Sequence, residues 1–197
     1  MKSPALFLDR DGTINEEVDF LTNPDHLHLI GGVSAALRDA KSMGFRLFVI
    51  TNQSGIARGL LTEDRLREIH ETLNARLTAE GAGIDRFYYC PHHPELGVGD
   101  YRTSCDCRKP KPGMINRAIA EFSVDPAASF VIGDRMIDIE AGNAAGIRSI
   151  MVLTGYGADE LELCREQNLP VFHVAENLPE AIRFIKKNIH QSQPSLQ

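Results

Sequence analysis

The stretch ALFLDRDGT at residues 5–13 passes from an apolar run directly into a group of charged side chains. Residues 5–8 have the composition of a short buried strand, and Asp9 and Asp11 follow where that strand would end. Because alternate residues of an extended chain point to the same side, the two carboxylates can face one site. The stretch therefore predicts a buried strand that carries paired carboxylates at its carboxyl end.

Further short apolar runs follow along the chain, at residues 47–50, 87–89, 130–132, 150–153 and 171–174. Between most of them apolar residues recur with helical spacing, as in the stripes Val33, Ala36, Leu37, Ala40 and Leu66, Ile69, Leu73, Leu77. Thr62 is the expected N-cap of the second helix, and Gly44 and Gly81 stand where the two helices would stop. Strands that alternate with helices predict an α/β fold, a three-layer doubly wound (Rossmann-like) and mostly parallel sheet.

The chain has 197 residues, of which 43% are hydrophobic, and this is enough to fill one domain over residues 1–197. It contains neither a run of about 18 apolar residues nor the apolar region of a signal peptide, so a cytoplasmic protein with reduced cysteines is expected. The net charge of -6 argues against nucleic-acid and membrane partners, because phosphate-rich surfaces attract basic proteins. A monomer is the expected state, although composition leaves this open, and the polar tail at residues 190–197 is expected to fray.

Polar motifs mark three more predicted element ends: ITNQSG at 50–55, RKPKPG at 108–113 ahead of a helix, and IGDRMID at 132–138. In a doubly wound sheet the carboxyl ends of the strands meet at one crevice. We therefore expect five side chains to converge there, namely Asp9, Asp11, Thr51, Lys109 and Asp134. Mg²⁺ prefers carboxylate oxygens and typically takes one or two of them with substrate phosphate and water. With an ammonium group beside the carboxylates, the pattern predicts a phosphate site.

A cluster of thiols lies in the segment 88–113, which has no helical period. Its possible ligands are Cys90, His92, Cys105 and Cys107, in the pattern C-x-H followed by C-x-C. Three thiolates and one imidazole are the ligands of a closed, structural zinc site, and a zinc-binding loop at about 88–109 is predicted. The alternative is a group of small buried thiols. Spacing alone leaves His92 and His93 as alternatives, and Cys164 is interpreted as a helix-packing thiol.

The four motifs, D-R-D-G-T, T-N, a Lys before a helix and G-D-x-x-x-D, resemble in their order those of the haloacid dehalogenase-like phosphatase superfamily. This resemblance implies a fold without a large cap, in which Asp9 is the nucleophile that forms an aspartyl-phosphate. It also implies that Asp11 is the general acid and then the base, and that Thr51 and Lys109 hold the phosphoryl oxygens. Catalytic Mg²⁺ would be bound by Asp9, Asp134 and the backbone carbonyl of Asp11.

Asp138, the last residue of the G-D-x-x-x-D motif, has two interpretations. It either supports the metal ligands from behind or lies in the first turn of the following helix, where an acidic side chain interacts favourably with the helix dipole. We therefore do not predict it as a direct metal ligand.

Within this superfamily the chain is similar to two groups that share the zinc loop, the D-glycero-D-manno-heptose 1,7-bisphosphate phosphatases and the histidinol-phosphatases. The similarity rests on TNQSGIARG, YYCPHHPE and CDCRKPKPGM, and it selects His92 as the zinc ligand. The long loop and the IARG segment favour the first group. This implies removal of the C7 phosphate in the synthesis of nucleotide-activated heptose, for lipopolysaccharide or another glycoconjugate, with the anomer left open. The alternatives are a histidinol-phosphatase or other small-molecule phosphatase, a polynucleotide 3'-phosphatase and a non-catalytic metal-binding module.

The same resemblance implies a set of substrate contacts for a sugar bisphosphate: Glu17, Val18, Asp19, Phe20, Asn52, Gln53, Ser54, Arg108 and Arg135. For Arg108, its chemistry also supports the role of a substrate contact. Its planar, permanently charged guanidinium suits a second phosphate, while the neighbouring Lys109 holds the transferring one.

Overall fold

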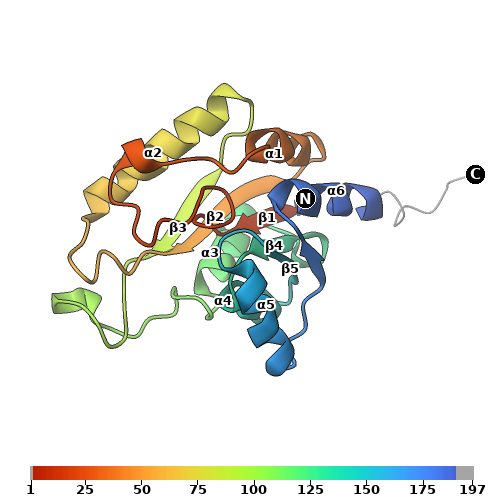
Figure 1. Cartoon of the computed structure of the whole chain (residues 1–197). Helices are drawn as coiled ribbons and strands as arrows, with labels where there is room; N and C mark the ends of the chain where they lie inside the picture. The colour runs from red at the N-terminus through yellow and green to blue at the C-terminus, as the bar shows by residue number, and fades with distance from the viewer. Residues whose placement is uncertain (1, 190–197) are drawn as a thin grey trace, which may run out of the picture.

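Six parallel strands form the central sheet of the protein in the computed structural model, in the order β3-β2-β1-β4-β5-β6 (Figure 1). The structure describes residues 2–189, and the polar tail predicted at 190–197 lies outside them. The strands are β1 (Ala5–Leu8), β2 (Arg46–Asn52), β3 (Arg86–Cys90), β4 (Phe130–Gly133), β5 (Arg148–Val152) and β6 (His173–Ala175). Each contains or overlaps one of the apolar runs that predict strands.

Helices cover both faces of the sheet. They are α1 (Val33–Ser42), α2 (Glu63–Ala79), α3 (Gly113–Phe122), α4 (Met136–Ala144), α5 (Gly157–Glu166) and α6 (Leu178–Ile189). Helices α1, α2 and α6 lie on one face, and α3, α4 and α5 lie on the other (Figure 1). Along β1 the side chains alternate, so that Leu6 and Leu8 pack into the first layer while Phe7 packs into the second. The predicted three-layer doubly wound α/β fold is confirmed.

The predicted N-cap, apolar stripes and terminal glycines of α1 and α2 are found at the expected places. The Thr62 hydroxyl accepts a hydrogen bond from the Arg65 amide at 3.1 Å, which satisfies one of the free donors of the first turn of α2. The apolar stripes of both helices are buried, and Gly44 and Gly81 follow one residue after each C-cap. Both helices are therefore confirmed within a residue or two of the positions that periodicity indicates.

The winding of the chain reverses between β1 and β4. From β1 the chain adds β2 and then β3 on one side, and from β4 it adds β5 and then β6 on the other. Such a switch point opens a crevice beyond the carboxyl ends of the two central strands. Asp9 follows β1 and Asp134 follows β4, so the topology places both carboxylates at this crevice.

The segment between β3 and α3 contains only a short 3₁₀ turn, Gly99–Tyr101. It is tied to the body by Val98, whose amide donates to the Ala57 carbonyl at 3.0 Å, and by Tyr101, whose hydroxyl donates to Glu63 at 2.8 Å.

The strands and helices of residues 2–189 leave no further domain inserted between them, in line with the predicted capless fold. None of the helices in this range is long and apolar enough to cross a lipid bilayer. Two further 3₁₀ turns are Pro24–His26 and Pro126–Ala128.

Candidate active site

The Lys109 side chain lies at the centre of the crevice and is only 3% exposed. Its Nζ donates to Asp9 Oδ1 at 2.6 Å, to Asp138 Oδ1 at 2.5 Å and to the Ile50 carbonyl at 2.9 Å. Burial by itself would lower the pKa of Lys109, but the charges of Asp138 and Asp9 raise it above its usual value. Lys109 is therefore a buried cation that offsets the charge of two carboxylates.

Asn52, at the end of β2, holds the backbone of Lys109. The Asn52 side-chain NH₂ donates to the Lys109 carbonyl at 3.0 Å, and the Lys109 amide donates to the Asn52 side-chain oxygen at 3.0 Å. Asn52 lines the crevice, as expected for a substrate contact, but the NH₂ group and the oxygen of its side-chain amide both bond to the Lys109 backbone. In this structure it positions the lysine, 57 residues away in sequence.

Three carboxylates meet beside Lys109: those of Asp9, Asp134 and Asp138 have oxygens within 4.8 Å of one another. Burial, followed by the charges of Asp9 and Asp138, raises the pKa of Asp134 to about 8. Burial is also the largest cause that raises the pKa of Asp9 to about 7, against the opposing charge of Lys109. Asp134 Oδ1 is buried and has no hydrogen-bond partner. A crowded set of carboxylates with one unpartnered oxygen fits a divalent cation of the Mg²⁺ type.

Asp138 lies in the first turn of α4, which is one of its two interpretations, and its role behind the metal ligands stays a prediction. Its Oδ1 contacts Lys109, while its Oδ2 accepts a hydrogen bond from the Arg135 amide at 3.1 Å and so caps α4. The contact with Lys109 is not among the predictions from the sequence. The signal that points to it is the motif spacing, which places Asp138 on the first turn of α4 facing back toward Asp134.

Asp11 lies beside Arg10, and the two side chains form a forked ion pair. Arg10 donates to Asp11 Oδ2 at 2.7 Å and to Oδ1 at 2.9 Å, and further hydrogen bonds come from Asn15 and Gln53, each at 3.0 Å. Burial raises the pKa of Asp11, but the charge and hydrogen bonds of Arg10 outweigh it and hold the pKa below its usual value. The carboxylate form, which is the form of a general base, is therefore favoured before substrate arrives. A phosphate dianion next to Asp11 would favour its protonation, because like charges disfavour a second anion.

Gln53 connects the predicted acid to the predicted phosphate ligand. Its NH₂ group donates to Asp11 Oδ2 at 3.0 Å and to the Thr51 hydroxyl at 2.8 Å. Thr51 is 1% exposed and Gln53 is 7% exposed, so the hydrogen bond between them is shielded from water. The sequence predicted Gln53 as a substrate contact, and in this structure its amide nitrogen is used to hold two neighbouring site residues.

A cavity of about 280 Å³ opens above these groups. It is lined by most of the predicted residues: Asp9, Asp11, Glu17, Asp19, Phe20, Thr51, Asn52, Gln53, Ser54, Arg108, Lys109 and Arg135. Val18 is not in this lining. It is 41% exposed and lies in an adjoining open groove with Glu17 and Asp19. Asp134 lies beneath the cavity floor, 0% exposed.

Six residues of the lining were not among the predicted contacts, namely Arg10, Leu21, Gly55, Arg58, Ile137 and Tyr156, and two of them, Arg58 and Tyr156, contact predicted residues of the wall. The Arg58 guanidinium lies 5.7 Å from the centre of the Phe20 ring, and the Tyr156 hydroxyl donates to Asp19 at 3.1 Å. Arg58 belongs to the IARG segment after TNQSG, which is the sequence signal that points to it.

Tyr156 belongs to TGYG at 154–157, which connects the wall to the floor. Its amide donates to Asp134 Oδ2 at 2.9 Å. At Gly155, which has a φ of 58°, a Cβ atom would lie 2.2 Å from Asp134 Oδ2, so only glycine allows this close approach.

The predicted zinc ligands form one cluster, with Cys90, His92, Cys105 and Cys107 all within 4.8 Å of one another. Cys90 Sγ lies 3.4 Å from Cys105 Sγ, and Cys105 Sγ lies 3.2 Å from Cys107 Sγ. His92 Nδ1 lies 3.7 Å from Cys90 Sγ and 3.5 Å from Cys107 Sγ. Ligands at the corners of a tetrahedron around zinc lie about 3.3 to 3.8 Å apart. Both the donor set and its spacing therefore fit a tetrahedral metal site.

His93, the alternative ligand, faces its own loop instead. Its Nδ1 accepts hydrogen bonds from the amides of Glu95 and Leu96 at 3.2 Å and 2.9 Å. Next to the cluster, Arg108 donates to the His92 carbonyl at 3.1 Å, so the metal loop and the cavity wall share this residue.

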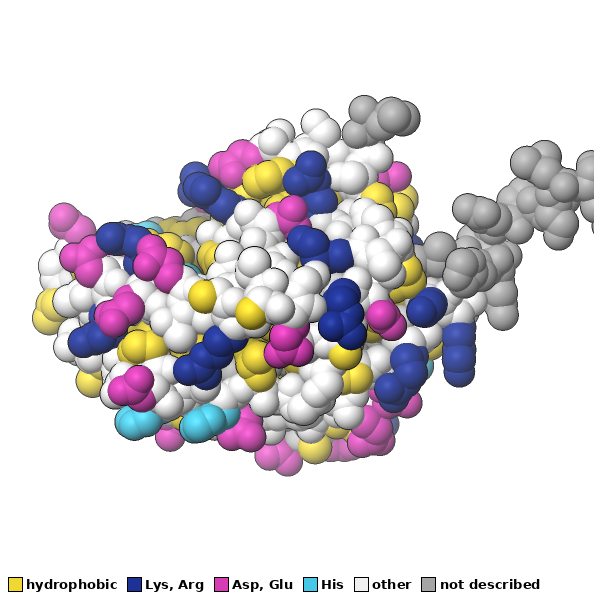
Figure 2. Space-filling model, turned by 90° about the horizontal axis from the view of Figure 1, so that it is seen from above, with side chains coloured by type: hydrophobic (Ala, Val, Ile, Leu, Met, Phe, Trp, Pro, Cys, Tyr) yellow, Lys and Arg dark blue, Asp and Glu magenta, His cyan; other side chains and the backbone are white. Residues whose placement is uncertain are grey.

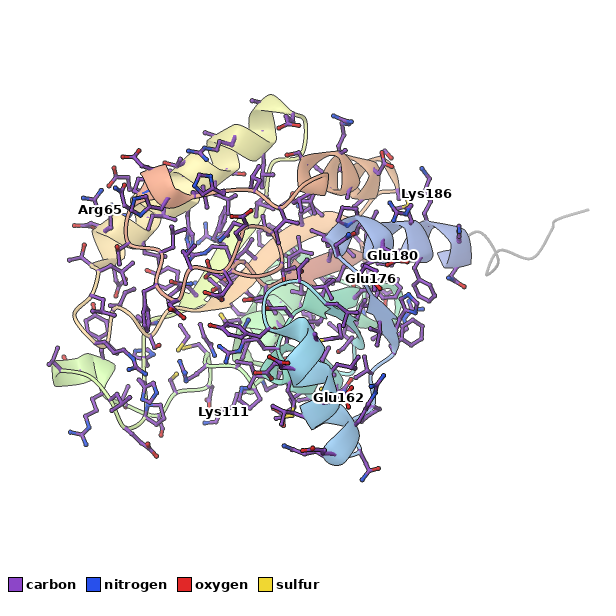
Figure 3. The ribbon with its side chains drawn as sticks, in the orientation of Figure 1. Arg65, Lys111, Glu162, Glu176, Glu180 and Lys186 are labelled. Atoms are coloured by element: carbon purple, nitrogen blue, oxygen red, sulfur yellow. The ribbon has the colours of Figure 1, made fainter. Side chains whose placement is uncertain are left out.

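The basic residues of the stretch 105–113 have different surroundings. Lys111, labelled in Figure 3, lies on the outer side of the loop with a side chain that is 54% exposed and pairs with Asp106 at 3.5 Å. Lys109, two residues earlier, is buried in the crevice. Only Arg108 and Lys109 of these cations line the 280 Å³ cavity.

On the face shown in Figure 2, Lys and Arg side chains are interspersed with Asp and Glu side chains. This mixture agrees with the net charge of -6.

A family model described as HAD-hydrolase-like matches residues 106–181. Among curated proteins, a D-glycero-beta-D-manno-heptose-1,7-bisphosphate 7-phosphatase of Photorhabdus laumondii is 43% identical over 185 residues, which cover 93% of this chain and 97% of the relative. A phosphatase of the same description from Escherichia coli K12 is 45% identical over 153 residues, covering 77% of this chain and 80% of the relative.

A crystal structure of D,D-heptose 1,7-bisphosphate phosphatase from B. bronchiseptica, complexed with magnesium and phosphate, has a similar fold. Its TM-score is 0.84 and its sequence identity 32%, and the match covers 94% of this chain and 99% of that one. The similarity therefore extends over nearly the whole of both chains.

Proposed function

The chain belongs to the heptose-1,7-bisphosphate 7-phosphatase family of haloacid dehalogenase-like hydrolases, and on that premise we propose that it removes the C7 phosphate of D-glycero-D-manno-heptose 1,7-bisphosphate. The observation that carries the proposal is that one cavity contains two separate kinds of anion site. Its floor has the buried Asp9–Lys109 pair, and its wall has the Arg108 guanidinium. A bisphosphate supplies an anion to each.

In the proposed reaction a carboxylate oxygen of Asp9 attacks the C7 phosphorus, and the bond from phosphorus to the sugar oxygen breaks. Asp11 gives its proton to that leaving oxygen. In the second half, Asp11 takes a proton from water, and the water oxygen attacks the phosphorus of the aspartyl-phosphate. This releases inorganic phosphate and restores Asp9. The Lys109 charge and the Thr51 hydroxyl offset and orient the phosphoryl oxygens, because a carboxylate and a phosphate dianion otherwise repel each other.

Mg²⁺ belongs to this proposal as the catalytic metal, held by Asp9, Asp134 and the backbone carbonyl of Asp11. When bound, it supplies positive charge to the transferring phosphoryl group. The unpartnered, buried Oδ1 of Asp134 supports this assignment, since a buried carboxylate oxygen without a donor is costly unless a cation meets it.

Zn²⁺ is the proposed structural metal, held by Cys90, His92, Cys105 and Cys107. With four protein ligands, such a site has no open position for substrate. The residues of this site act by holding the loop that leads from Cys107 directly into Arg108 and Lys109.

The remaining contacts would recognise the sugar and its second phosphate. Arg108 is proposed for the C1 phosphate, with Arg135 as a further contact. Glu17, Asp19, Phe20 and Ser54 would face the sugar, since all four line the cavity. We also propose that the protein is a monomeric cytoplasmic enzyme that acts on a small molecule. Size-exclusion chromatography with light scattering should give the mass of one chain.

The function is tested by comparing kcat/KM for the β and α anomers of the heptose bisphosphate and for histidinol phosphate, all with Mg²⁺. The two relatives carry the β anomer in their descriptions, so the β anomer is expected to give the highest value. The product should be heptose 1-phosphate, identified by the phosphate that stays on C1. A preference for histidinol phosphate would instead assign the chain to the second group that shares the zinc loop.

A further inference from the structure

Arg10 stands out among the residues of the cavity because it is a fully buried arginine, 0% exposed. Its Nε and one terminal nitrogen face Asp11, at 3.1 Å and 2.7 Å. The other terminal nitrogen lies 3.2 Å from Nε2 of His70. The planar guanidinium is therefore held between a carboxylate on one edge and an imidazole on the other.

His70 lies on α2 and is buried, 6% exposed, although it takes no part in the proposed chemistry. Its ring stacks on Phe87 with centroids 4.6 Å apart and an interplanar angle of 21°, and it packs against Tyr89 in a T-shaped arrangement with centroids 6.1 Å apart. Burial, followed by the charge of Arg10, lowers the pKa of His70 to about 3. The ring is therefore neutral at ordinary pH.

The chemistry of the two groups fixes the direction of their hydrogen bond. A guanidinium can only donate, so Nε2 of His70 accepts and Nδ1 carries the ring proton. The stacking on Phe87 fixes the plane of the acceptor, and the acceptor fixes the rotation of the guanidinium. With one terminal nitrogen occupied by His70, the edge formed by Nε and the other nitrogen remains directed at Asp11.

We propose that His70 is a positioning residue for the hydrolysis: by accepting from Arg10 it holds the guanidinium fork that orients the Asp11 carboxylate. This inference rests on the acid and base role proposed for Asp11. His70 does not line the cavity and does not touch the reacting atoms. A purely structural histidine would affect every substrate alike, whereas a residue that orients the acid should matter most where the leaving group needs a proton.

The test compares two variants and two substrates. His70→Phe keeps an aromatic ring against Phe87 but removes the acceptor, and His70→Gln restores a side-chain oxygen at a similar reach. Each is assayed on the heptose 1,7-bisphosphate, whose alkoxide is a poor leaving group, and on 4-nitrophenyl phosphate, whose phenolate leaves readily. We expect His70→Phe to lower kcat about tenfold on the sugar substrate and little on the aryl one, with most of the loss recovered in His70→Gln.

Asp11→Asn is the reference in the same assays. If Asp11→Asn slows both substrates equally, the acid role of Asp11 is wrong and the proposal falls with it. If Asp11→Asn separates the substrates while His70→Phe slows both by one factor, or slows neither, only the inference about His70 is overturned. Failure of His70→Gln to recover the sugar activity has the same meaning.

A measurement on the unsubstituted protein keeps the idea testable even if His70→Phe does not fold. In ¹⁵N NMR of the imidazole rings, the signal that disappears in His70→Gln should belong to a neutral ring protonated at Nδ1 from pH 6 to 8. A ring protonated at Nε2 could not accept from Arg10, and that result would refute the proposal.

Discussion

Lys109 shows how single residues of this site depend on one another. An isolated buried ammonium would lose its proton, but the two carboxylates at 2.6 Å and 2.5 Å keep it charged. The same cation lowers the repulsion that Asp9 would present to a phosphate dianion. Loss of one partner would leave the other charge buried without compensation, which costs several kcal/mol.

Asp9→Asn is expected to abolish turnover, on the order of 10⁴-fold or more, because an amide of the same volume cannot attack phosphorus. Phosphate release measures the activity, and a single cooperative thermal transition should show that the variant keeps its fold, although the loss of a charged partner of Lys109 lowers its Tm. Asp39→Asn is the matched control, since Asp39 is an exposed residue of α1 that pairs with Lys186. Substantial activity in Asp9→Asn would refute the assignment of the nucleophile.

Arg108→Ala is expected to lower kcat/KM for the bisphosphate by about 10- to 100-fold and to change that for a monophosphate far less. A charge-assisted hydrogen bond is worth about 1.5 to 3 kcal/mol, and only the bisphosphate brings a second anion. The control is Arg65→Ala, at the start of α2 (Figure 3), where the side chain pairs with Glu68 at the surface. Equal losses on both substrates would make Arg108 a general electrostatic contributor.

At the scale of elements, the loop from β3 to α3 has little regular structure, yet it must place two side chains accurately. It must deliver Arg108 and Lys109 to the crevice from outside the sheet. The thiol cluster directly before them and the two hydrogen bonds from Asn52 to the Lys109 backbone hold this segment at both sides. A displacement of about 1 Å near a reacting centre can cost on the order of a hundredfold in rate.

Cys107→Ser should therefore lower zinc content, thermal stability and bisphosphate selectivity together, and added Mg²⁺ should not restore them. Metal analysis of the purified parent should find about one zinc per chain, as one four-ligand site requires. Cys164→Ser is the matched control, because Cys164 is a buried thiol of α5 that lies in a different apolar cluster. Its zinc content should equal that of the parent. A zinc-free parent with the same fold and selectivity would instead identify the cluster as ordinary buried thiols.

At the scale of the whole molecule, the site joins both layers of helices. Helix α2 from one layer supplies His70, while helix α4 from the other supplies Asp138. The central sheet between them carries Asp9 and Asp134 at the ends of its two middle strands. Global stability and the geometry of the site are consequently linked through the same buried polar groups.

The pH dependence of unfolding tests this link. The unfolded chain binds a proton at His70 below its ordinary pKa of 6.5, whereas the folded protein does so only near 3. Because the unfolded state binds more protons in this range, stability is expected to fall as pH falls from 6.5 toward 3, by up to about 1.4 kcal/mol per pH unit from this residue.

The free energy of unfolding, measured by denaturant titration at several pH values, should therefore depend less steeply on pH in His70→Gln than in the parent. Both proteins keep the same carboxylates and thiols, so the difference between their slopes isolates His70. Identical slopes would show that the residue titrates normally in the folded protein.

Much of the fold and of the candidate site could be predicted from the sequence alone. Helices α1 and α2 were predictable from the spacing of their apolar residues and from Thr62, because periodicity and capping are local properties of the chain. The arrangement of β1 and β4 was also predictable in outline, since parallel strands direct Asp9 and Asp134 to the same edge of a sheet. The C-x-H and C-x-C spacings indicated a metal cluster, although they did not separate His92 from His93.

Only the tertiary structure decided which partners these side chains take. Asn52 and Gln53 line the cavity, as expected for substrate contacts, but that their side-chain amides also hold Lys109 and Asp11 was not predictable. The contacts of Asp138 with Lys109 and of His70 with Arg10 join residues 29 and 60 positions apart. No periodic pattern encodes such pairs, because a buried polar group takes the donor or acceptor that packing of distant elements brings within about 3 Å.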